Sequence, residues 1–443
     1  MRTEPRRTGH CQLAVASALL PGLVFVACHP SLETSPHCQR RGLVARSVTV
    51  DTGFEGAAVE VMRIAGNLVQ LCLLPDGGGR HPKPKTETGP SSGGRHPGQW
   101  FYFRASELTK GELYQFQLDV SGARAWRSYK GYEVCTSYTG HHWCRCLGTL
   151  YDSGARILLW NVTAEASSCF FAYFEPYGLG QLESLLREAA DAGAERRTMG
   201  RTTDGRSIDA LCFPPGLLQT GREPAGEPTV VWITCRQHAA ETQASFFAEG
   251  VVQSVLSEPL PLSLAIVLVP NMNPDGSARG HTRENAQGVD LNREWRPKAD
   301  YSQNGRSPEV SAVQAAMLDT GVDVHLDVHG DEAADSAYSY PGLPRFRAPD
   351  HVAQLFDELE EELHSRSGGF YMPRPGSGSA RTAAFWTGTQ FGALSLTLEM
   401  PYKDSEPTKA CSKSCRRLGS IAVDAIRSLG PRLGRFRRSR TRP

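Results

Sequence analysis

The chain has 443 residues, of which 40% are hydrophobic and 21% charged, a composition typical of a folded protein long enough for two domains. Its formal net charge of +1 provides no strong field that would draw it to nucleic acid or to acidic membranes, so neither is predicted as a partner. The 12 cysteines are scattered along the chain, and they permit disulfides without demanding them.

Residues 1–46 are predicted to be a targeting or disordered leader. Arg2, Arg6 and Arg7 precede the apolar run 14–28, which resembles the apolar region of a secretory signal but is too short to span a bilayer comfortably. Further arginines follow the run, so an organellar transit peptide is an alternative. A disordered leader or a mispredicted start codon is another. No other stretch is apolar enough for stable membrane insertion.

Residues 47–177 are predicted to form an antiparallel β-sandwich-like domain. The expected strands are short, rich in β-branched and aromatic residues, and separated by turn residues. They are residues 48–50, 68–74, 100–103, 114–120 and 157–162. The segment 75–98 is rich in Gly, Pro and polar residues, so we expect a flexible hairpin insertion there.

Residues 178–430 are predicted to form an α/β domain, in which a mixed, mainly parallel sheet is flanked by helices. Apolar strands alternate with segments of helical periodicity, and Ser307, Pro308 and Gly321 mark the ends of one helix. The expected strands are residues 230–234, 264–269, 322–328 and 394–398. Residues 431–443 are rich in arginine, and we expect a basic disordered tail.

Polar residues follow each of these four strands at the point where the strand stops. In open α/β sheets, ligands bind beyond the carboxyl ends of the strands. Four strands that deliver His, Glu, Asn, Asp and Arg side chains to one edge therefore predict a single site.

His238 and Glu241 are the first candidate metal ligands, because residues three positions apart on a turn or helix start can face the same way. Alone, this spacing is a weak signal and favours a satisfied surface pair. His329 follows a predicted strand and is the expected third ligand. His325 competes with it, but lies inside the strand and is interpreted as a hydrogen-bonded core histidine. Two His and one Glu suit a catalytic Zn²⁺ that keeps a fourth position open.

Glu399 closes an apolar run and is expected to be partly buried. A buried carboxylate without a partner is costly, so a neighbouring metal site would explain it, whereas a structural ion pair is the alternative. Arg283, Asn292 and Arg293 lie between the metal motifs and could together clamp a carboxylate. Any one of them taken alone would be interpreted as surface charge.

In this order, the motifs resemble those of zinc metallocarboxypeptidases. The strings HGDE after His329 and TLEMPYKD around Glu399 resemble the cytosolic carboxypeptidase subfamily, as does the β-rich N-terminal part with its WFYFR string. The similarity covers roughly residues 48–410. One departure is HAAE in place of the subfamily's usual HPGE, but neither changed residue is a ligand, so metal binding should survive.

The resemblance implies a role for each residue around the metal. His238, Glu241 and His329 would hold one zinc ion per chain. Asp290, in the string GVDLNR, would orient His238 from behind. Glu399 would act as the general base and pass its proton to the leaving amine.

The resemblance also implies how substrate would bind. Asn292 and Arg293 would hold the terminal carboxylate, and Arg283 would polarise the scissile carbonyl. Members of the subfamily often remove glutamates, a preference that needs a cation, and Arg381 in the loop before Glu399 is the candidate. Tyr371 is the only nearby candidate for the mobile tyrosine of the carboxypeptidase A type.

The sequence thus predicts a zinc metallocarboxypeptidase that acts on the C-terminus of peptides or proteins. The alternatives are a zinc amidohydrolase of the aspartoacylase or desuccinylase type, acting on acylated amino acids, and a catalytically inactive peptide-binding protein. The family resemblance predicts a cytoplasmic location. A functional targeting peptide in residues 1–46 would instead make the protein organellar or secreted.

Overall fold

The computed structural model describes residues 47–76, 98–217, 228–296, 305–376, 378–406 and 408–440, all within the unit Arg46–Pro443. The predicted leader, and all but the ends of the predicted insertion 75–98, lie outside these residues. Both therefore remain predictions. Among the described helices, none is both long and apolar enough to cross a membrane.

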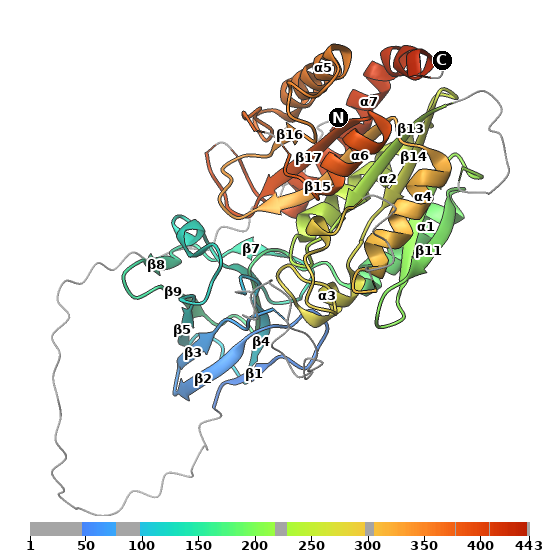
Figure 1. Cartoon of the computed structure of the whole chain (residues 1–443). Coiled ribbons are helices and arrows are strands. Elements are labelled where there is room, and N and C mark those ends of the chain that lie inside the picture. The colour runs from blue at the N-terminus through green and yellow to red at the C-terminus, as the bar shows by residue number, and fades with distance from the viewer. Residues whose placement is uncertain are drawn as a thin grey trace, which may run out of the picture. The chain divides into compact units, whose positions relative to one another are not determined.

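The N-terminal part contains two five-stranded sheets (Figure 1). In the first sheet all neighbouring strands are antiparallel, and the order is β1 (Thr49–Asp51), β4 (Tyr102–Ser106), β10 (Ser168–Ala172), β6 (Cys135–Ser137) and β7 (Cys144–Arg145). The second sheet is antiparallel except for its β3–β5 pair. Its order is β2 (Glu60–Ala65), β3 (Leu68–Cys72), β5 (Leu113–Asp119), β9 (Ile157–Thr163) and β8 (Leu150–Asp152). A 3₁₀ helix, η1 (Trp126–Tyr129), follows β5.

Aromatic side chains join the two N-terminal sheets. Every second residue of β5 is buried, as a strand with one face on a core requires. Phe116 of β5 lies 4.6 Å from Phe171 of β10 and 6.1 Å from Phe103 of β4, measured between ring centroids. Trp160 of β9 stacks on Phe116 at 5.3 Å. The predicted sandwich-like arrangement therefore rests on rings from both sheets, which stabilise each other beyond simple burial.

The C-terminal part is built on a seven-stranded sheet. Its order is β11 (Glu195–Arg201), β12 (Ser207–Phe213), β14 (Leu264–Val269), β13 (Thr229–Cys235), β15 (Val324–Asp331), β17 (Leu394–Pro401) and β16 (Tyr338–Pro341). The four strands β14, β13, β15 and β17 are parallel, and the outer three pair antiparallel. The predicted α/β fold is confirmed, and the four predicted strands are its parallel centre.

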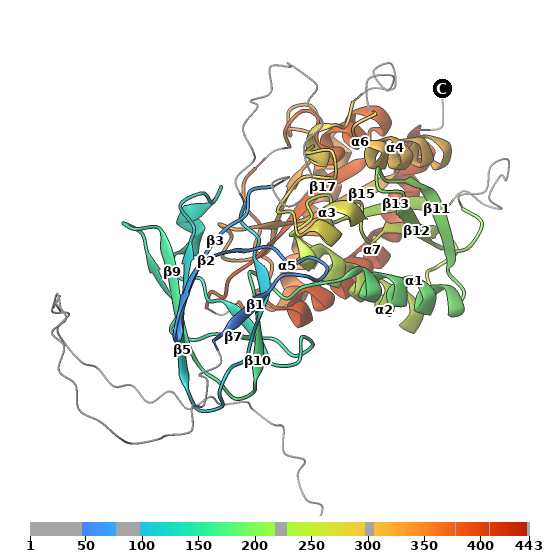
Figure 2. The same ribbon diagram turned by 90° about the horizontal axis from the view of Figure 1, so that it is seen from below.

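Helices cover both faces of this sheet (Figure 2). Val231, Ile233 and Cys235 of β13 share a core with one helix layer, whereas Val230 and Trp232 point to the other. The first layer contains α1 (Leu179–Asp191), α2 (Thr242–Ser257), α5 (Asp350–Ser367) and α7 (Ser412–Arg440). The second contains α4 (Pro308–Thr320) and α6 (Ala383–Phe391), and the short α3 (Pro274–Arg279) follows β14. Burial on both faces explains why the central strands are continuously apolar.

Three expectations need correction. One strand was predicted to end at residue 328, but β15 continues to Asp331. Another was predicted to end at residue 398, but β17 continues to Pro401, because the two strands remain paired as far as these residues. The disordered tail predicted from residue 431 is wrong as far as Arg440, where α7 ends. Apolar residues at helical spacing lie among the basic ones and bury one face of α7; they are Leu418, Ala422, Ala425, Ile426, Leu429 and Leu433.

Candidate metal centre and active site

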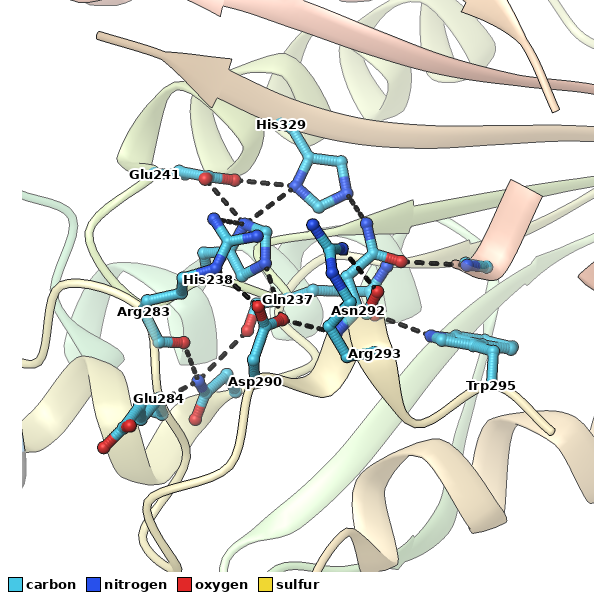
Figure 3. A network of polar contacts seen from close by, with 12 residues as sticks. Gln237, His238, Glu241, Arg283, Glu284, Asp290, Asn292, Arg293, Trp295 and His329 are labelled. Carbon is cyan, nitrogen blue, oxygen red and sulfur yellow. Dashed lines mark hydrogen bonds and ion pairs between the residues drawn. The ribbon is translucent and has the colours of Figure 1, made fainter. Parts of the chain in front are cut away.

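Three buried side chains meet near the carboxyl ends of the neighbouring strands β13 and β15 (Figure 3). His238 lies in the turn after β13, Glu241 is the residue before α2, and His329 lies in β15 next to β13. The Nδ1 atom of His238 is 2.7 Å from Glu241 Oε1, and the Nδ1 atom of His329 is 2.8 Å from Glu241 Oε2. The two Nδ1 atoms are 3.1 Å apart. Their exposures are 3%, 5% and 1% for His238, Glu241 and His329, so the group is closed on most sides.

The hydrogen-bond partners of the two imidazoles fit a metal ion. His238 Nε2 is 3.1 Å from Asp290 Oδ1, and His329 Nε2 is 2.9 Å from Asp327 Oδ2. A carboxylate accepts, so each Nε2 atom can donate its proton to an aspartate, which leaves Nδ1 as the nitrogen that could offer its lone pair to a metal ion. Two imidazole nitrogens and a carboxylate that converge at these distances form a donor set suited to Zn²⁺.

The electrostatics of the centre favour positive charge. Although burial acts to lower the pKa of His329, Asp327 and Glu241 outweigh it and raise the pKa well above its usual value. Burial acts to raise the pKa of Glu241, but His238 and His329 hold that pKa below its usual value. A group of side chains that stabilises positive charge inside a protein is one that a divalent cation can occupy.

Arg283 reaches the centre from the loop after α3. Its Nε atom donates to Asp290 Oδ2 at 2.6 Å, and its Nη1 atom is 3.3 Å from His238 Nδ1 (Figure 3). Asp290 therefore contacts both His238 and Arg283, one with each carboxylate oxygen. This sharing places a guanidinium beside the imidazole that faces the metal position.

Asn292 and Arg293 lie in the 3₁₀ helix η2 (Leu291–Arg293). Asn292 Oδ1 accepts from the backbone N–H of Ala383 at 2.8 Å, which orients the amide. Its Nδ2 atom is 3.1 Å from His329 Nε2, but that nitrogen already donates to Asp327, so the amide N–H groups find no acceptor there. Arg293 is exposed, and its Nη1 donates to the carbonyl of Asn292 at 2.8 Å.

Glu399 lies directly opposite His329 in the parallel ladder between β15 and β17. Side chains of paired residues project to the same face, so the carboxyl group and the imidazole are neighbours. Within the described part of the chain, Glu399 Oε2 is buried and has no hydrogen-bond partner. Burial raises the pKa of Glu399 well above its usual value, and the charge of Glu241 adds to this effect while His329 opposes it.

The other sequence candidates lie farther from this chemistry. Arg381 precedes α6, its side chain is 54% exposed, and its Nη2 atom is 3.9 Å from Glu294 Oε1. His325 is a core histidine between Thr234 and Thr387, at 2.9 Å from each hydroxyl, and burial lowers its pKa to about 4.

Tyr371 does not suit the role of a mobile tyrosine. It is fully buried, and its hydroxyl donates to Glu360 at 2.8 Å and lies 2.6 Å from the hydroxyl of Ser339. A side chain held in this way has no freedom to swing toward substrate.

Sequence reasoning missed Asp327, the partner of His329. The signal was present, because His325, Asp327 and His329 alternate with apolar residues and so share one face of β15. Asp327 also accepts from Thr234 at 2.8 Å and from Gln237 at 2.6 Å, so its second oxygen is satisfied.

Comparison with known proteins agrees with this geometry. A family model described as zinc carboxypeptidase matches residues 182–404, and one described as the cytosolic carboxypeptidase N-terminal domain matches residues 50–174. The first match covers just over half of the chain. The chain therefore belongs to the zinc carboxypeptidase family, and it is a carboxypeptidase hydrolase with zinc as its cofactor.

Individual relatives cover different shares of their own length. An uncharacterised protein of Zymomonas mobilis is 29% identical, over 81% of this chain and 89% of its own. The solved metallo-carboxypeptidase of Pseudomonas aeruginosa in complex with (2-guanidinoethylmercapto)succinic acid is 29% identical, with a TM-score of 0.73 over 87% of this chain and 100% of that chain. Human cytosolic carboxypeptidase 1 is 24% identical over 55% of this chain, which spans only 23% of that relative.

Proposed function

We propose that this enzyme hydrolyses the last peptide or isopeptide bond of peptides and proteins, with a preference for terminal glutamate. The observation that carries the proposal is that His238, Glu241 and His329 meet at one place and that Glu399 lies opposite His329 in the strand ladder. A zinc ion held by the three ligands supplies Lewis acidity, which polarises a carbonyl and activates water.

Glu399 is the general base in this proposal. Its raised pKa makes the carboxylate a stronger proton acceptor than an exposed glutamate, and Oε2 has no competing partner among the described residues. It takes a proton from the attacking water and then delivers it to the nitrogen of the leaving residue. One side chain thus serves as base and afterwards as acid.

Arg283, Asn292 and Arg293 are the proposed substrate-binding groups. The guanidinium of Arg283, fixed by Asp290, faces the position of the scissile carbonyl oxygen and stabilises the charge that develops there. The oriented amide of Asn292 and the exposed fork of Arg293 hold the terminal carboxylate. Such an arrangement favours cleavage at the end of a chain over cleavage in its middle.

The preference for glutamate rests on Arg381 in this proposal. Its ion pair with Glu294 is long, at 3.9 Å, and its side chain is 54% exposed, so exchanging this partner for a substrate carboxylate costs little. Glutamate at the C-terminus would then bind through both of its carboxylates.

We also propose the division into an N-terminal domain, residues 47–177, and a catalytic domain that begins at residue 178 and extends to Arg440, where α7 ends. The two family matches, which end at 174 and begin at 182, support it. Relatives named cytosolic carboxypeptidases support a cytoplasmic location.

The test of the activity is mass spectrometry of peptides that differ only in their C-terminal residue. We expect zinc-loaded enzyme to release single terminal residues, glutamate fastest, and chelated enzyme to release none. Acylated amino acids serve as a parallel substrate set. Hydrolysis of these alone, with no loss of terminal residues from peptides, would replace the proposal with the amidohydrolase alternative.

The test of the glutamate preference is Arg381→Ala. Because one charged contact is lost, we expect kcat/KM for peptides ending in glutamate to fall roughly tenfold more than for peptides ending in alanine. The matched control is Arg347→Ala, which removes another exposed loop arginine. An equal fall for both peptides would remove Arg381 from the specificity pocket.

A further inference from the structure

A carboxylate of the N-terminal part binds the backbone of the loop that carries Arg283. Asp76 is only 2% exposed. Its Oδ1 accepts from the backbone N–H of Thr282 at 2.6 Å, and its Oδ2 accepts from Arg283 at 2.6 Å and from Glu284 at 3.1 Å. Three consecutive N–H groups, more than two hundred positions away in sequence, thus point at one buried carboxylate. Charge-assisted hydrogen bonds of this kind are among the stronger ones in proteins.

The chain segment on the other side of residues 77–97 contacts the same loop. The hydroxyl of Thr282 accepts from the backbone N–H of Gln99 at 2.7 Å and of Trp100 at 3.0 Å. Gly98 approaches Leu74 so closely that a Cβ at Gly98 would lie 1.9 Å from the Leu74 carbonyl oxygen. The segments on the two sides of residues 77–97 therefore lie in direct contact with each other, and both bind the loop that carries Arg283.

The catalytic part holds the opposite side of the loop. The carbonyl of Thr282 accepts from the backbone N–H of Ala240, one residue before the ligand Glu241, at 2.9 Å. The side chain of Asn273 donates to the carbonyl of Glu284 at 3.2 Å. Beyond these backbone contacts, the guanidinium of Arg283 is held by Asp290.

We propose that Asp76 is a positioning residue for Arg283: it fixes the backbone from which the guanidinium reaches the scissile carbonyl, so the N-terminal domain completes the active site. This inference rests on the proposed role of Arg283. Asp76 does not contact the metal position or substrate, and it acts through three N–H groups of the loop. Without the three hydrogen bonds to Asp76, the loop would keep its contacts to Asn273 and Ala240 but would no longer hold Arg283 at a fixed distance from His238.

The first measurement is the steady-state kinetics of Asp76→Asn, which keeps the shape of the side chain but replaces one acceptor oxygen with a donor. We expect kcat to fall on the order of tenfold to a hundredfold, with KM changed by less than about threefold, because the lost alignment matters most in the transition state. The matched control is Asp152→Asn, since Asp152 is an exposed residue that also accepts backbone N–H groups, from Gly154 and Ala155. Wild-type kcat in Asp76→Asn would overturn the inference.

The second measurement combines Asp76→Asn with Arg283→Ala under single-turnover conditions. If Asp76 acts through Arg283, the double variant is no slower than Arg283→Ala alone, whereas independent effects would multiply. Multiplication would overturn the inference. If Arg283→Ala alone has wild-type kcat, the proposed role of Arg283 fails, and the positioning role falls with it.

Hydrogen exchange tests the contact without using activity. We expect the amides of residues 282–284 to exchange faster in Asp76→Asn than in wild type or Asp152→Asn, because one of their two acceptor oxygens and the negative charge are lost. Unchanged exchange would overturn the contact itself, whatever the fate of the proposed function. Should Asp76→Asn fail to fold, Thr282→Ser and Thr282→Val replace it: serine keeps the acceptor for Gln99 and Trp100 and should retain kcat, and valine should lower it. Equal kcat in this pair would count against the inference.

Discussion

Each of the two histidines that face the metal position has an aspartate as hydrogen-bond partner, and the two aspartates are positioned in different ways. Asp327 lies two positions before His329 in the same strand, so strand geometry alone puts both side chains on one face. Asp290 lies 52 positions after His238 and is held in place because it also caps η2 and binds Arg283. The position of Asp327 follows from the alternation of residues in one strand, whereas the position of Asp290 depends on the folded conformation of its loop.

Replacing Glu399 by glutamine tests the general base. The amide has nearly the same shape but cannot accept the proton, so we expect kcat to fall by about two to four orders of magnitude while one zinc per chain remains bound. Activity assays and atomic absorption measure the two quantities. Glu361→Gln, an exposed change in α5, is the control. Full hydrolysis by Glu399→Gln would refute its role.

The residues of the site could be found from sequence where they close apolar runs or keep a fixed spacing. His238, Glu241 and His329 belong to such patterns, and the structure brings them together. Asp76 could not be found in this way. It borders a segment without periodicity, and its partners are determined by tertiary folding rather than by neighbours in the chain.

At the scale of elements, the four central parallel strands of the larger sheet were predicted, whereas outer strands such as β11 were not. β13 and β14 are buried on both faces and stand out as apolar runs. β11 has the sequence ERRTMGR, with three arginines, because it is an outer strand whose side chains reach solvent and acidic partners. Arg196, for example, binds Glu183 and Asp209. Charge on an edge strand masks the strand pattern but protects against unwanted pairing.

Close packing between α2 and α7 depends on two glycines. A Cβ at Gly250 would lie 1.9 Å from the carbonyl oxygen of Arg416, and one at Gly419 would lie 2.1 Å from that of Phe247. Gly250→Ala or Gly419→Ala should therefore lower the free energy of unfolding by about 1–3 kcal/mol.

Denaturant unfolding of the purified variants measures this loss. Gly180→Ala in α1 is the control, because nothing lies within 4 Å of its added Cβ. Alanine there should leave stability unchanged or raise it by up to about 1 kcal/mol. The same response in all three variants would show that helix propensity, and not contact between α2 and α7, decides.

At the scale of the whole molecule, the metal centre joins parts that are distant in sequence. Its ligands come from the turn after β13 and from β15, and the loop of Arg283 connects it to the N-terminal part through Asp76 and Thr282. Arg145 of β7 adds another link, because its Nη2 donates to the carbonyl of Ala410 at 2.8 Å. Sequence patterns predicted both architectures, but contacts between them involve single side chains that have no periodicity.

Removing zinc should lower the thermal stability of the whole chain. An ion that binds only the folded state stabilises it by about 2.7 kcal/mol when its free concentration is a hundred times Kd. Scanning calorimetry with and without a chelator should therefore show a lower Tm for the chelated enzyme. In His329→Ala the chelator should have little effect. Identical Tm values for wild type under both conditions would contradict the expectation that bound zinc stabilises the folded enzyme.

The pairing of His329 with Glu399 restricts which insertions and deletions the two strands β15 and β17 can accept. Successive residues of a strand point to opposite faces, so deleting one codon between Leu394 and Glu399 would turn the carboxyl group to the wrong side of the sheet. Deleting two would restore the side but shift the group by about 7 Å along the strand. Insertions and deletions should therefore be tolerated in the connecting loops but should abolish activity when they fall within these two strands. A library of all single-codon and double-codon insertions and deletions, assayed for activity, measures this directly.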